Sequence, residues 1–288
     1  MKKALFEGVC TALVTPFKEN SISVDQFKKL LAMQLEAGIR SFVICGTTGE
    51  APTLSEEEKL TLFREAKKFA GSKAVILAGT GSNCTESAVN LSMKAQDQGV
   101  DGLLVVSPYY NKCTEAGLLA HYRAIAQAVS IPILLYNVPS RTGVDIPVSV
   151  YRELAKLPNI AGVKEASPDL RKVAEIRRAC PEDFYVYSGN DDLLLPILSL
   201  GGRGVISVAS NVKPREMIGI TEAWYKGNLQ QAQAQFMSLL PLINALFSEV
   251  NPIPVKAALR MAGIDCGKCR LPLTDLSPEH SINLKKYL

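Results

Sequence analysis

Histidine is scarce in this sequence, and it contains neither long apolar runs nor blocks of like charge. The two histidines, His121 and His280, lie far apart with no carboxylate cluster nearby, so we expect no bound metal. No segment stays apolar for the roughly 18 residues that a membrane-spanning helix needs. Glu7 interrupts the apolar stretch that a signal peptide would need after Lys2 and Lys3. We therefore expect a cytoplasmic protein that does not cross a membrane.

Neither the charge distribution nor the glycine-rich segments indicate binding of nucleic acids or nucleotides. The 32 basic and 28 acidic residues leave a net charge of +4 with no basic stripe, which makes nucleic acid a poor candidate partner. No GxxxxGK[ST] motif occurs, and GTGSNC at 79–84 lacks the third glycine of a dinucleotide-binding turn. Seven cysteines, several within apolar runs, suit free thiols in a reducing compartment. The solitary CxxC of Cys266 and Cys269 is interpreted as a chance pair.

What is present is an alternation of short apolar runs with helical patterns. Eight runs read as buried parallel strands, at 9–16, 41–46, 74–80, 102–108, 133–138, 160–166, 184–189 and 205–209. Eight such units predict an α/β fold, the (β/α)8 barrel, over residues 1–226. The strand pattern then stops, and helices expected at 229–247, 254–262 and 277–288 form a C-terminal helical region over 227–288.

Three helix starts carry sequence signals. Ser23 with Gln26 and Ser55 with Glu58 predict capping boxes. Ser167 followed by Pro168 predicts an N-cap with proline at the first helical position.

Catalytic groups in such barrels gather where strands run into the following loops, which directs attention to Lys164 in GVKEAS. Alternation along a strand places one of each neighbouring pair inside the barrel. An amine removed from water is more readily neutral, and a neutral amine can form a Schiff base with a carbonyl substrate. The alternative is that Lys164 points outward or forms a salt bridge with Glu165 or another acid.

Other strand ends offer groups that complement such an amine. The phenol of Tyr136, on the neighbouring strand, can move a proton, and the Thr47-Thr48 turn can hold a small carboxylate. Arg141 can bind a second carboxylate through its guanidinium fork. Taken singly, each has an ordinary structural explanation. The Tyr109-Tyr110 pair is equally compatible with a packing or subunit contact.

Six motifs in order, GTTGE, PYYN, YNVPSRTG, GVKEAS, SGND and GVISVASN, resemble the dihydrodipicolinate synthase family of pyruvate-dependent class I aldolases over nearly the whole chain. The resemblance implies a lyase of lysine and diaminopimelate biosynthesis that condenses pyruvate with L-aspartate 4-semialdehyde. It implies no metal and no dissociable cofactor. It also implies a homo-oligomer, usually a tetramer built as a dimer of dimers.

The same resemblance implies roles for individual residues. Lys164 matches the imine-forming lysine, and Tyr136, Thr47 and Tyr110 match a proton-relay triad in which Tyr110 reaches across from a neighbouring subunit.

Four further residues match the family's substrate-binding positions. Thr48 matches the contact to the pyruvate carboxylate, and Arg141 matches the contact to the semialdehyde carboxylate. Gly189 and the backbone of Ile206 match the wall near the imine.

One departure concerns regulation. Asn83 and Tyr109 match the lysine effector site, but Glu56, Lys59 and Ser87 stand where lysine-inhibited members carry histidines and an acid. We therefore expect weak or absent feedback by lysine.

Two other functions stay open. The first is a related aldolase, such as N-acetylneuraminate lyase or a 2-keto-3-deoxy-sugar aldolase, with Asp191 on a sugar hydroxyl; Arg141 argues against it. The second is a catalytically silent barrel scaffold.

Overall fold

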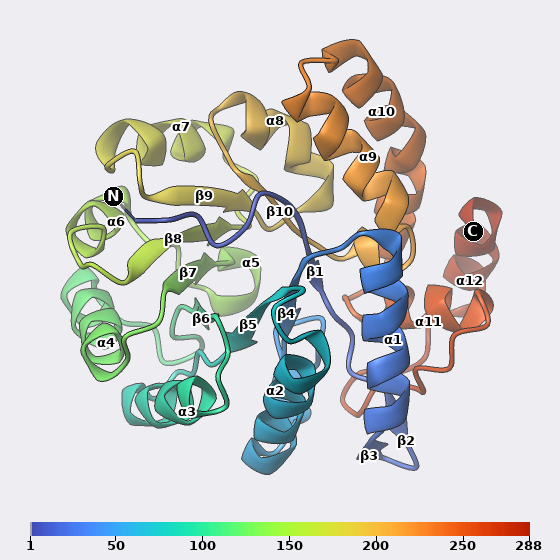
Figure 1. The fold of residues 1–288 in the computed structure, drawn as a ribbon, viewed down its shortest axis with the longest axis horizontal. Coiled ribbons are helices and arrows are strands. Elements are labelled where there is room, and N and C mark those ends of the chain that lie inside the picture. The colour runs from blue at the N-terminus through green and yellow to red at the C-terminus, as the bar shows by residue number, and fades with distance from the viewer. Residues whose placement is uncertain (1) are drawn as a thin grey trace.

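Eight parallel strands form the centre of the molecule. The computed structural model describes residues 2–288. The barrel strands in them are β1 (Gly8–Ala12), β4 (Ser41–Ile44), β5 (Val75–Gly79), β6 (Gly102–Val106), β7 (Ile133–Asn137), β8 (Ile160–Glu165), β9 (Tyr185–Ser188) and β10 (Gly204–Ser207). Their order is β1, β10, β9, β8, β7, β6, β5, β4, and β1 pairs with β4 to close the barrel (Figure 1). The predicted (β/α)8 barrel is confirmed.

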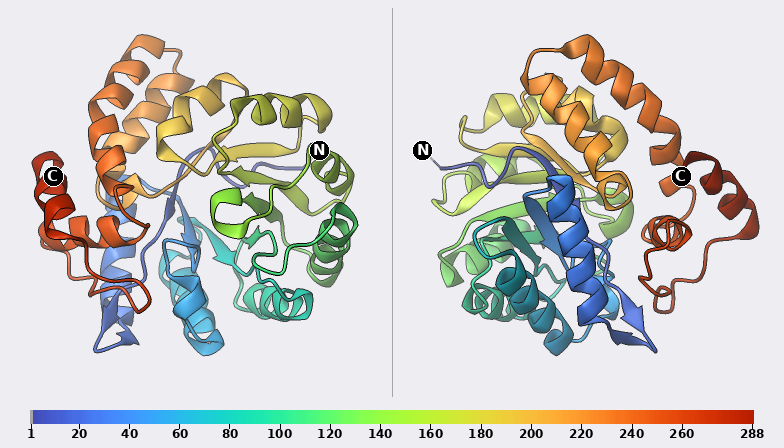
Figure 2. Two further views of the ribbon diagram at one scale, coloured as in Figure 1. Left: turned by 180° about the vertical axis from the view of Figure 1, so that it is seen from behind. Right: turned by 45° about the vertical axis from the view of Figure 1, so that its right-hand side comes forward.

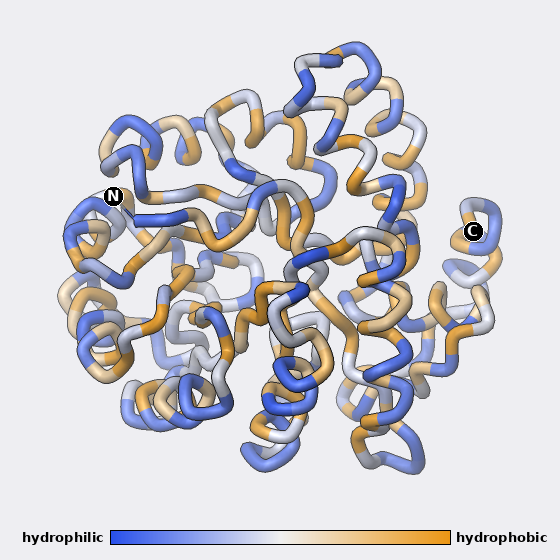
Figure 3. The backbone as a smooth tube through the Cα atoms, viewed as in Figure 1, coloured by the Kyte–Doolittle hydropathy of each residue, from blue (hydrophilic) through white to orange (hydrophobic). Residues whose placement is uncertain are grey.

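A principal helix follows each strand and covers the outside of the barrel. These helices are α1 (Val24–Ala37), α2 (Glu56–Ala70), α3 (Thr85–Asp97), α4 (Glu115–Ala128), α6 (Val148–Leu154), α7 (Leu170–Ala179), α8 (Leu194–Ser199) and α9 (Pro214–Tyr225). Hydrophobic and hydrophilic residues are interspersed along these helices (Figure 3), as expected when one side of a helix packs on a sheet and the other faces water.

Two apolar clusters follow from the alternation of side chains along the strands. In β7, Leu135 belongs to the large cluster between the barrel and its helices, whereas its neighbour Leu134 belongs to a smaller cluster inside the barrel. The smaller cluster also holds Tyr136, Tyr187 and Ile206. The strands therefore bury both faces, which explains their nearly continuous apolar runs.

The C-terminal region is helical, as expected. It contains α10 (Leu229–Leu246), α11 (Ile253–Met261) and α12 (Pro278–Leu284), and it lies on the outside of the barrel beyond α9 (Figure 2). The chain between α11 and α12 packs against the segment that follows β1, where the carbonyl of Cys266 accepts a hydrogen bond from Phe17 N at 3.1 Å. Of the helices in the described chain, none combines the length and apolarity needed to cross a bilayer.

Several short elements were not expected from the sequence. They are the hairpin of β2 (Phe17–Lys18) and β3 (Ser21–Ile22), helix α5 (Pro139–Thr142), and the 3-10 helices η1 (Ala51–Thr53), η2 (Asp191–Leu193), η3 (Ala209–Asn211) and η4 (Lys285–Tyr287). Each is too short to produce a periodic pattern in the sequence.

Of the three predicted helix caps, only that of Ser55 is confirmed. Its side chain accepts from Glu58 N, and Glu58 caps Ser55 N in return. The Ser23 box is wrong: within the described chain its side chain makes no capping hydrogen bond, and its N–H is used by Pro16 O at 2.8 Å. The Ser167 cap is also wrong, because Ser167 N donates to the Glu165 carboxylate and Asp169 caps α7 instead.

Candidate active site

Lys164 lies inside the barrel. Its register partners on the two neighbouring strands, Tyr136 and Tyr187, both belong to the interior cluster. Its side chain is buried, with 5% of the residue exposed, and Nζ lies 4.2 Å from the centroid of the Tyr136 ring. The amine and the phenol therefore come from adjacent strands to the same point near the carboxyl ends of those strands.

The neighbouring acid does not neutralise this amine. Glu165 is buried on the opposite side of β8, where its carboxylate accepts from Asn137 Nδ2 at 2.9 Å, Ser167 N at 2.8 Å and Tyr151 Oη at 3.3 Å. Alternation along the strand thus separates the two side chains. Among the described residues Lys164 forms no ion pair with any other acid either, so the alternative that it points outward or forms a salt bridge is wrong.

A cavity of about 260 Å³ opens at the same end of the barrel, and Thr47, Tyr136 and Arg141 line it. Lys164 lies behind Tyr136 rather than in the cavity wall. The charged residues of the described lining are Lys59 and Arg141, with no carboxylate among them. This cavity therefore suits an anionic ligand.

The GTTGE segment forms a tight turn after β4. Glu50 N donates to Thr47 O at 3.0 Å, and Thr15 Oγ1 donates to Gly49 O at 2.7 Å. The turn exposes Thr47 to the cavity and buries Thr48, whose hydroxyl accepts from Asn251 Nδ2 at 3.0 Å.

Asn251 connects two predicted binding residues and was missed from the sequence. Besides its contact with Thr48, its backbone carbonyl accepts from Arg141 Nη2 at 3.2 Å. Its side-chain Oδ1 is buried and has no partner within residues 2–288. The one signal was its place next to Pro252, in the short segment between the helices expected at 229–247 and 254–262.

Gly189 and Ile206 lie at the ends of the strands that follow β8 around the barrel. Gly189 N donates to Glu165 O at 2.7 Å, and a Cβ at this glycine would lie 2.5 Å from Ala166 Cβ. Ile206 is fully buried in the interior cluster. The absence of a side chain at Gly189 therefore lets the backbone approach the strand that carries Lys164.

Tyr110 is the predicted residue that the fold does not bring to the others. It is 91% exposed, in a left-handed conformation with φ of 71°, whereas Tyr109 lines the cavity. A single chain therefore assembles Lys164, Tyr136 and Thr47 without Tyr110.

The residues of the expected effector site are partly engaged elsewhere. Glu56 forms an ion pair with Lys94 on the surface, and Asn83 O accepts from Asn111 Nδ2 at 2.9 Å. Lys59 and Tyr109 line the cavity. The resemblance thus puts the cationic side chain of Lys59 at the expected effector site, where a cationic effector would need an acceptor.

Burial raises the pKa of two other ionisable groups in the interior. Burial raises the pKa of the Cys10 thiol to about 12, which leaves it a poor competitor to the amine as a nucleophile. Burial also raises the pKa of Asp191, although Val208 N and Ala209 N each donate to its Oδ2 at 2.9 Å. In the part of the chain that the structure describes, no three His, Cys, Asp or Glu side chains are grouped to hold a metal ion.

Comparisons with known proteins place this geometry in a family. The model of the dihydrodipicolinate synthetase family matches residues 5–288. The 4-hydroxy-tetrahydrodipicolinate synthase of Caldicellulosiruptor bescii is 50% identical over 99% of this chain and 97% of its own, and that of Acetivibrio thermocellus is 45% identical over 100% and 98%. The structure of the enzyme from Cyanidioschyzon merolae with lysine bound has a TM-score of 0.96 at 44% identity, over 99% of this chain and 98% of that one. The chain belongs to the dihydrodipicolinate synthetase family.

Proposed function

We propose that the chain is a Schiff-base-forming lyase that condenses pyruvate with L-aspartate 4-semialdehyde to 4-hydroxy-tetrahydrodipicolinate, a step of lysine and diaminopimelate biosynthesis. The observation that carries this proposal is the buried amine of Lys164, 4.2 Å from the Tyr136 ring inside the barrel. The shared activity in the names of the full-length relatives supports it.

In the first half of the reaction, Lys164 Nζ attacks the ketone carbon of pyruvate, and loss of water gives an imine. The pyruvate methyl group then loses a proton, which yields an enamine. Tyr136 and Thr47 carry the protons of these steps, together with Tyr110 of a second copy of the chain. Thr48 holds the pyruvate carboxylate, and the backbones of Gly189 and Ile206 form the wall beside the imine.

In the second half, the enamine carbon attacks the aldehyde of the semialdehyde, whose carboxylate is held by Arg141. The amino group of the semialdehyde then adds to the imine carbon and displaces Lys164, which closes the ring and restores the free amine. The reaction needs two anion sites and one nucleophilic amine, and a cavity whose charged walls are Lys59 and Arg141 suits two acidic substrates.

The working unit is a homo-oligomer, a tetramer built as a dimer of dimers, in the cytoplasm. Support comes from the exposure of Tyr110, which leaves the triad incomplete in one copy. In each copy of the chain, residues 1–226 form the catalytic barrel and residues 227–288 form the helical region.

The sugar-aldolase alternative is weaker. It needs a polar group for a polyol, and the candidate, Asp191, is 1% exposed with one oxygen committed to two backbone N–H groups. The scaffold alternative leaves unexplained the burial of a lysine amine that forms no ion pair within residues 2–288.

The test is an assay of pyruvate consumption with aspartate semialdehyde, N-acetylmannosamine or a sugar-derived aldehyde as the second substrate. We expect turnover with the semialdehyde and at least about 100-fold less with either sugar. Lys164→Ala abolishes turnover, whereas Lys94→Ala, at an exposed ion pair with Glu56, leaves it intact. Full activity of Lys164→Ala, or a preference for a sugar, would overturn the proposal.

A further inference from the structure

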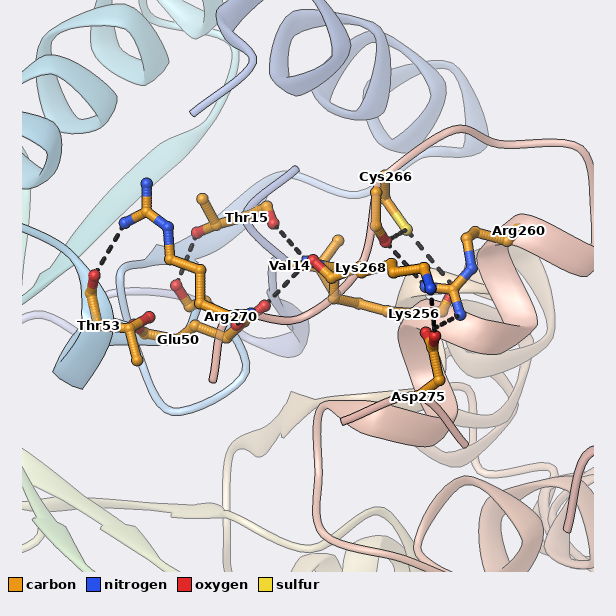
Figure 4. A network of polar contacts seen from close by, with 12 residues as sticks. Val14, Thr15, Glu50, Thr53, Lys256, Arg260, Cys266, Lys268, Arg270 and Asp275 are labelled. Carbon is orange, nitrogen blue, oxygen red and sulfur yellow. Dashed lines mark hydrogen bonds and ion pairs between the residues drawn. The ribbon is translucent and has the colours of Figure 1, made fainter. Parts of the chain in front are cut away.

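A second buried lysine lies in the C-terminal region, away from the cavity. Lys256, on α11, is fully buried, and its Nζ donates to Glu50 Oε1 at 2.9 Å, Thr15 O at 3.1 Å and Lys268 O at 2.8 Å (Figure 4). Nζ also lies 4.4 Å from the centroid of the Phe17 ring. All three hydrogens of the ammonium therefore have an acceptor, in a site with no access to water.

Glu50 is the anionic partner, and it is also fully buried. Its second oxygen, Oε2, accepts from the backbone N–H of Arg270 at 2.9 Å. The carboxylate thus joins two points of the C-terminal region, Lys256 and Arg270, to the loop that follows β4. The sequence separations are 206 and 220 residues, which explains why no local pattern revealed the cluster.

The position of Glu50 links this cluster to the candidate substrate site. Glu50 directly follows Thr47-Thr48-Gly49, and its backbone adopts a left-handed conformation with φ of 57°, which side-chain-bearing residues seldom adopt. Its N–H closes the turn onto Thr47 O at 3.0 Å. A side chain anchored at both oxygens keeps the backbone in this conformation.

Thr15 gives a second link to the same turn. Its carbonyl accepts from Lys256, and its hydroxyl donates to Gly49 O at 2.7 Å. Lys256 therefore holds the threonine turn from both sides, through Glu50 and through Thr15.

A buried ion pair such as Lys256 with Glu50 contributes more to local geometry than to the stability of the fold. Removing two charges from water costs about as much as their attraction returns, so well-packed apolar residues often stabilise a core equally well or better. What an ion pair adds is direction, because each of its hydrogen bonds fixes a distance and an angle.

We propose that Lys256 is a positioning residue for the capture of pyruvate: through Glu50 and Thr15 it sets the geometry of the Thr47-Thr48 turn. This proposal rests on the proposed function, in which Thr48 binds the pyruvate carboxylate. It gives the C-terminal region a part in the first chemical step although Lys256 does not line the cavity.

The test compares substrates in variants of the whole protein. Lys256→Met combined with Glu50→Leu removes both charges together, so neither is left buried alone. We expect this variant to need about tenfold to 100-fold more pyruvate for half-maximal trapping by borohydride, while KM for the semialdehyde stays within about twofold. Glu50→Gln, which keeps the side-chain volume, is expected to raise the pyruvate concentration for half-maximal trapping as well. It serves as the test variant if the double variant does not fold.

Arg260→Met is the matched control, because Arg260 lies one turn further along α11 and pairs with Asp275 at 3.2 Å, apart from Glu50. It is expected to leave both substrate constants unchanged. A folded double variant or Glu50→Gln protein with an unaltered pyruvate constant would overturn the inference, as would equal rises for both substrates. If the unmodified protein traps no pyruvate, the proposed function fails instead.

Discussion

Arg141 gives a sharp test of substrate assignment. One N–H of its Nη2 donates to Asn251 O at 3.2 Å, and the other four of its five guanidinium N–H groups have no partner in the described chain, which leaves enough donors to hold a carboxylate through two bonds. A hydrogen bond to a charged group contributes about 1.5–3 kcal/mol. Because Arg141 lies exposed at the rim of the cavity, we take about 2–3 kcal/mol for the pair of bonds together, which is about 30- to 150-fold in kcat/KM.

The assay varies the semialdehyde at saturating pyruvate. Arg141→Ala is expected to lose this factor mainly through KM for the semialdehyde, with trapping of pyruvate within about twofold of the unmodified protein. Arg141→Lys, which keeps the charge without the fork, is expected to fall between the two. An unchanged KM for the semialdehyde in Arg141→Ala, or an equal loss for pyruvate, would refute the assignment.

Three further outcomes are expected. Gly162→Ala places a Cβ 2.0 Å from Tyr185 O, and we expect it to lower the free energy of unfolding, measured by heat or urea, by about 2–4 kcal/mol. Gly219→Ala is the control: its nearest contact is at 3.5 Å, and we expect a loss of less than about 1 kcal/mol. Burial lowers the pKa of His121 to about 4, below its unfolded value of about 6.5. The free energy of unfolding is therefore expected to be highest above pH 6.5 and to fall by up to about 3 kcal/mol as the pH drops toward 4. A His121→Gln protein with the same pH dependence would contradict this. Lysine titrated into the assay is expected to inhibit weakly or not at all, and strong inhibition at low lysine would show that Lys59 does not block a cationic effector.

Local patterns predicted the barrel but not the direction of its key side chain. Eight apolar runs separated by helical segments allow few arrangements. Alternation places one of Val163 and Lys164 inside the barrel without saying which, and only the packing of Val163 in the outer cluster shows that it is Lys164. The cap of α7 was misplaced by two residues, from Ser167 to Asp169, because the helix begins only at Leu170 and the Asp169 carboxylate accepts from Arg171 N at 2.9 Å.

Contacts between distant parts of the chain were beyond such reasoning. Asn251 touches Thr48 across 203 residues, and Lys256 touches Glu50 across 206. Neither Asn251 nor Lys256 belongs to a motif with a chemical meaning of its own, so only the fold shows which residues they support. Tyr110 shows the same limit in another form, because under the proposed function its partners belong to a second copy of the chain.

The most direct test of the account is reduction with borohydride in the presence of pyruvate, followed by mass analysis of the digested protein. We expect one reduced pyruvyl group on the peptide that contains Lys164, with no label when pyruvate is omitted and none on the Lys164→Ala protein. Absence of any label, or a label on Lys59, the lysine that lines the cavity, would contradict the claim that a buried amine inside the barrel captures the keto acid.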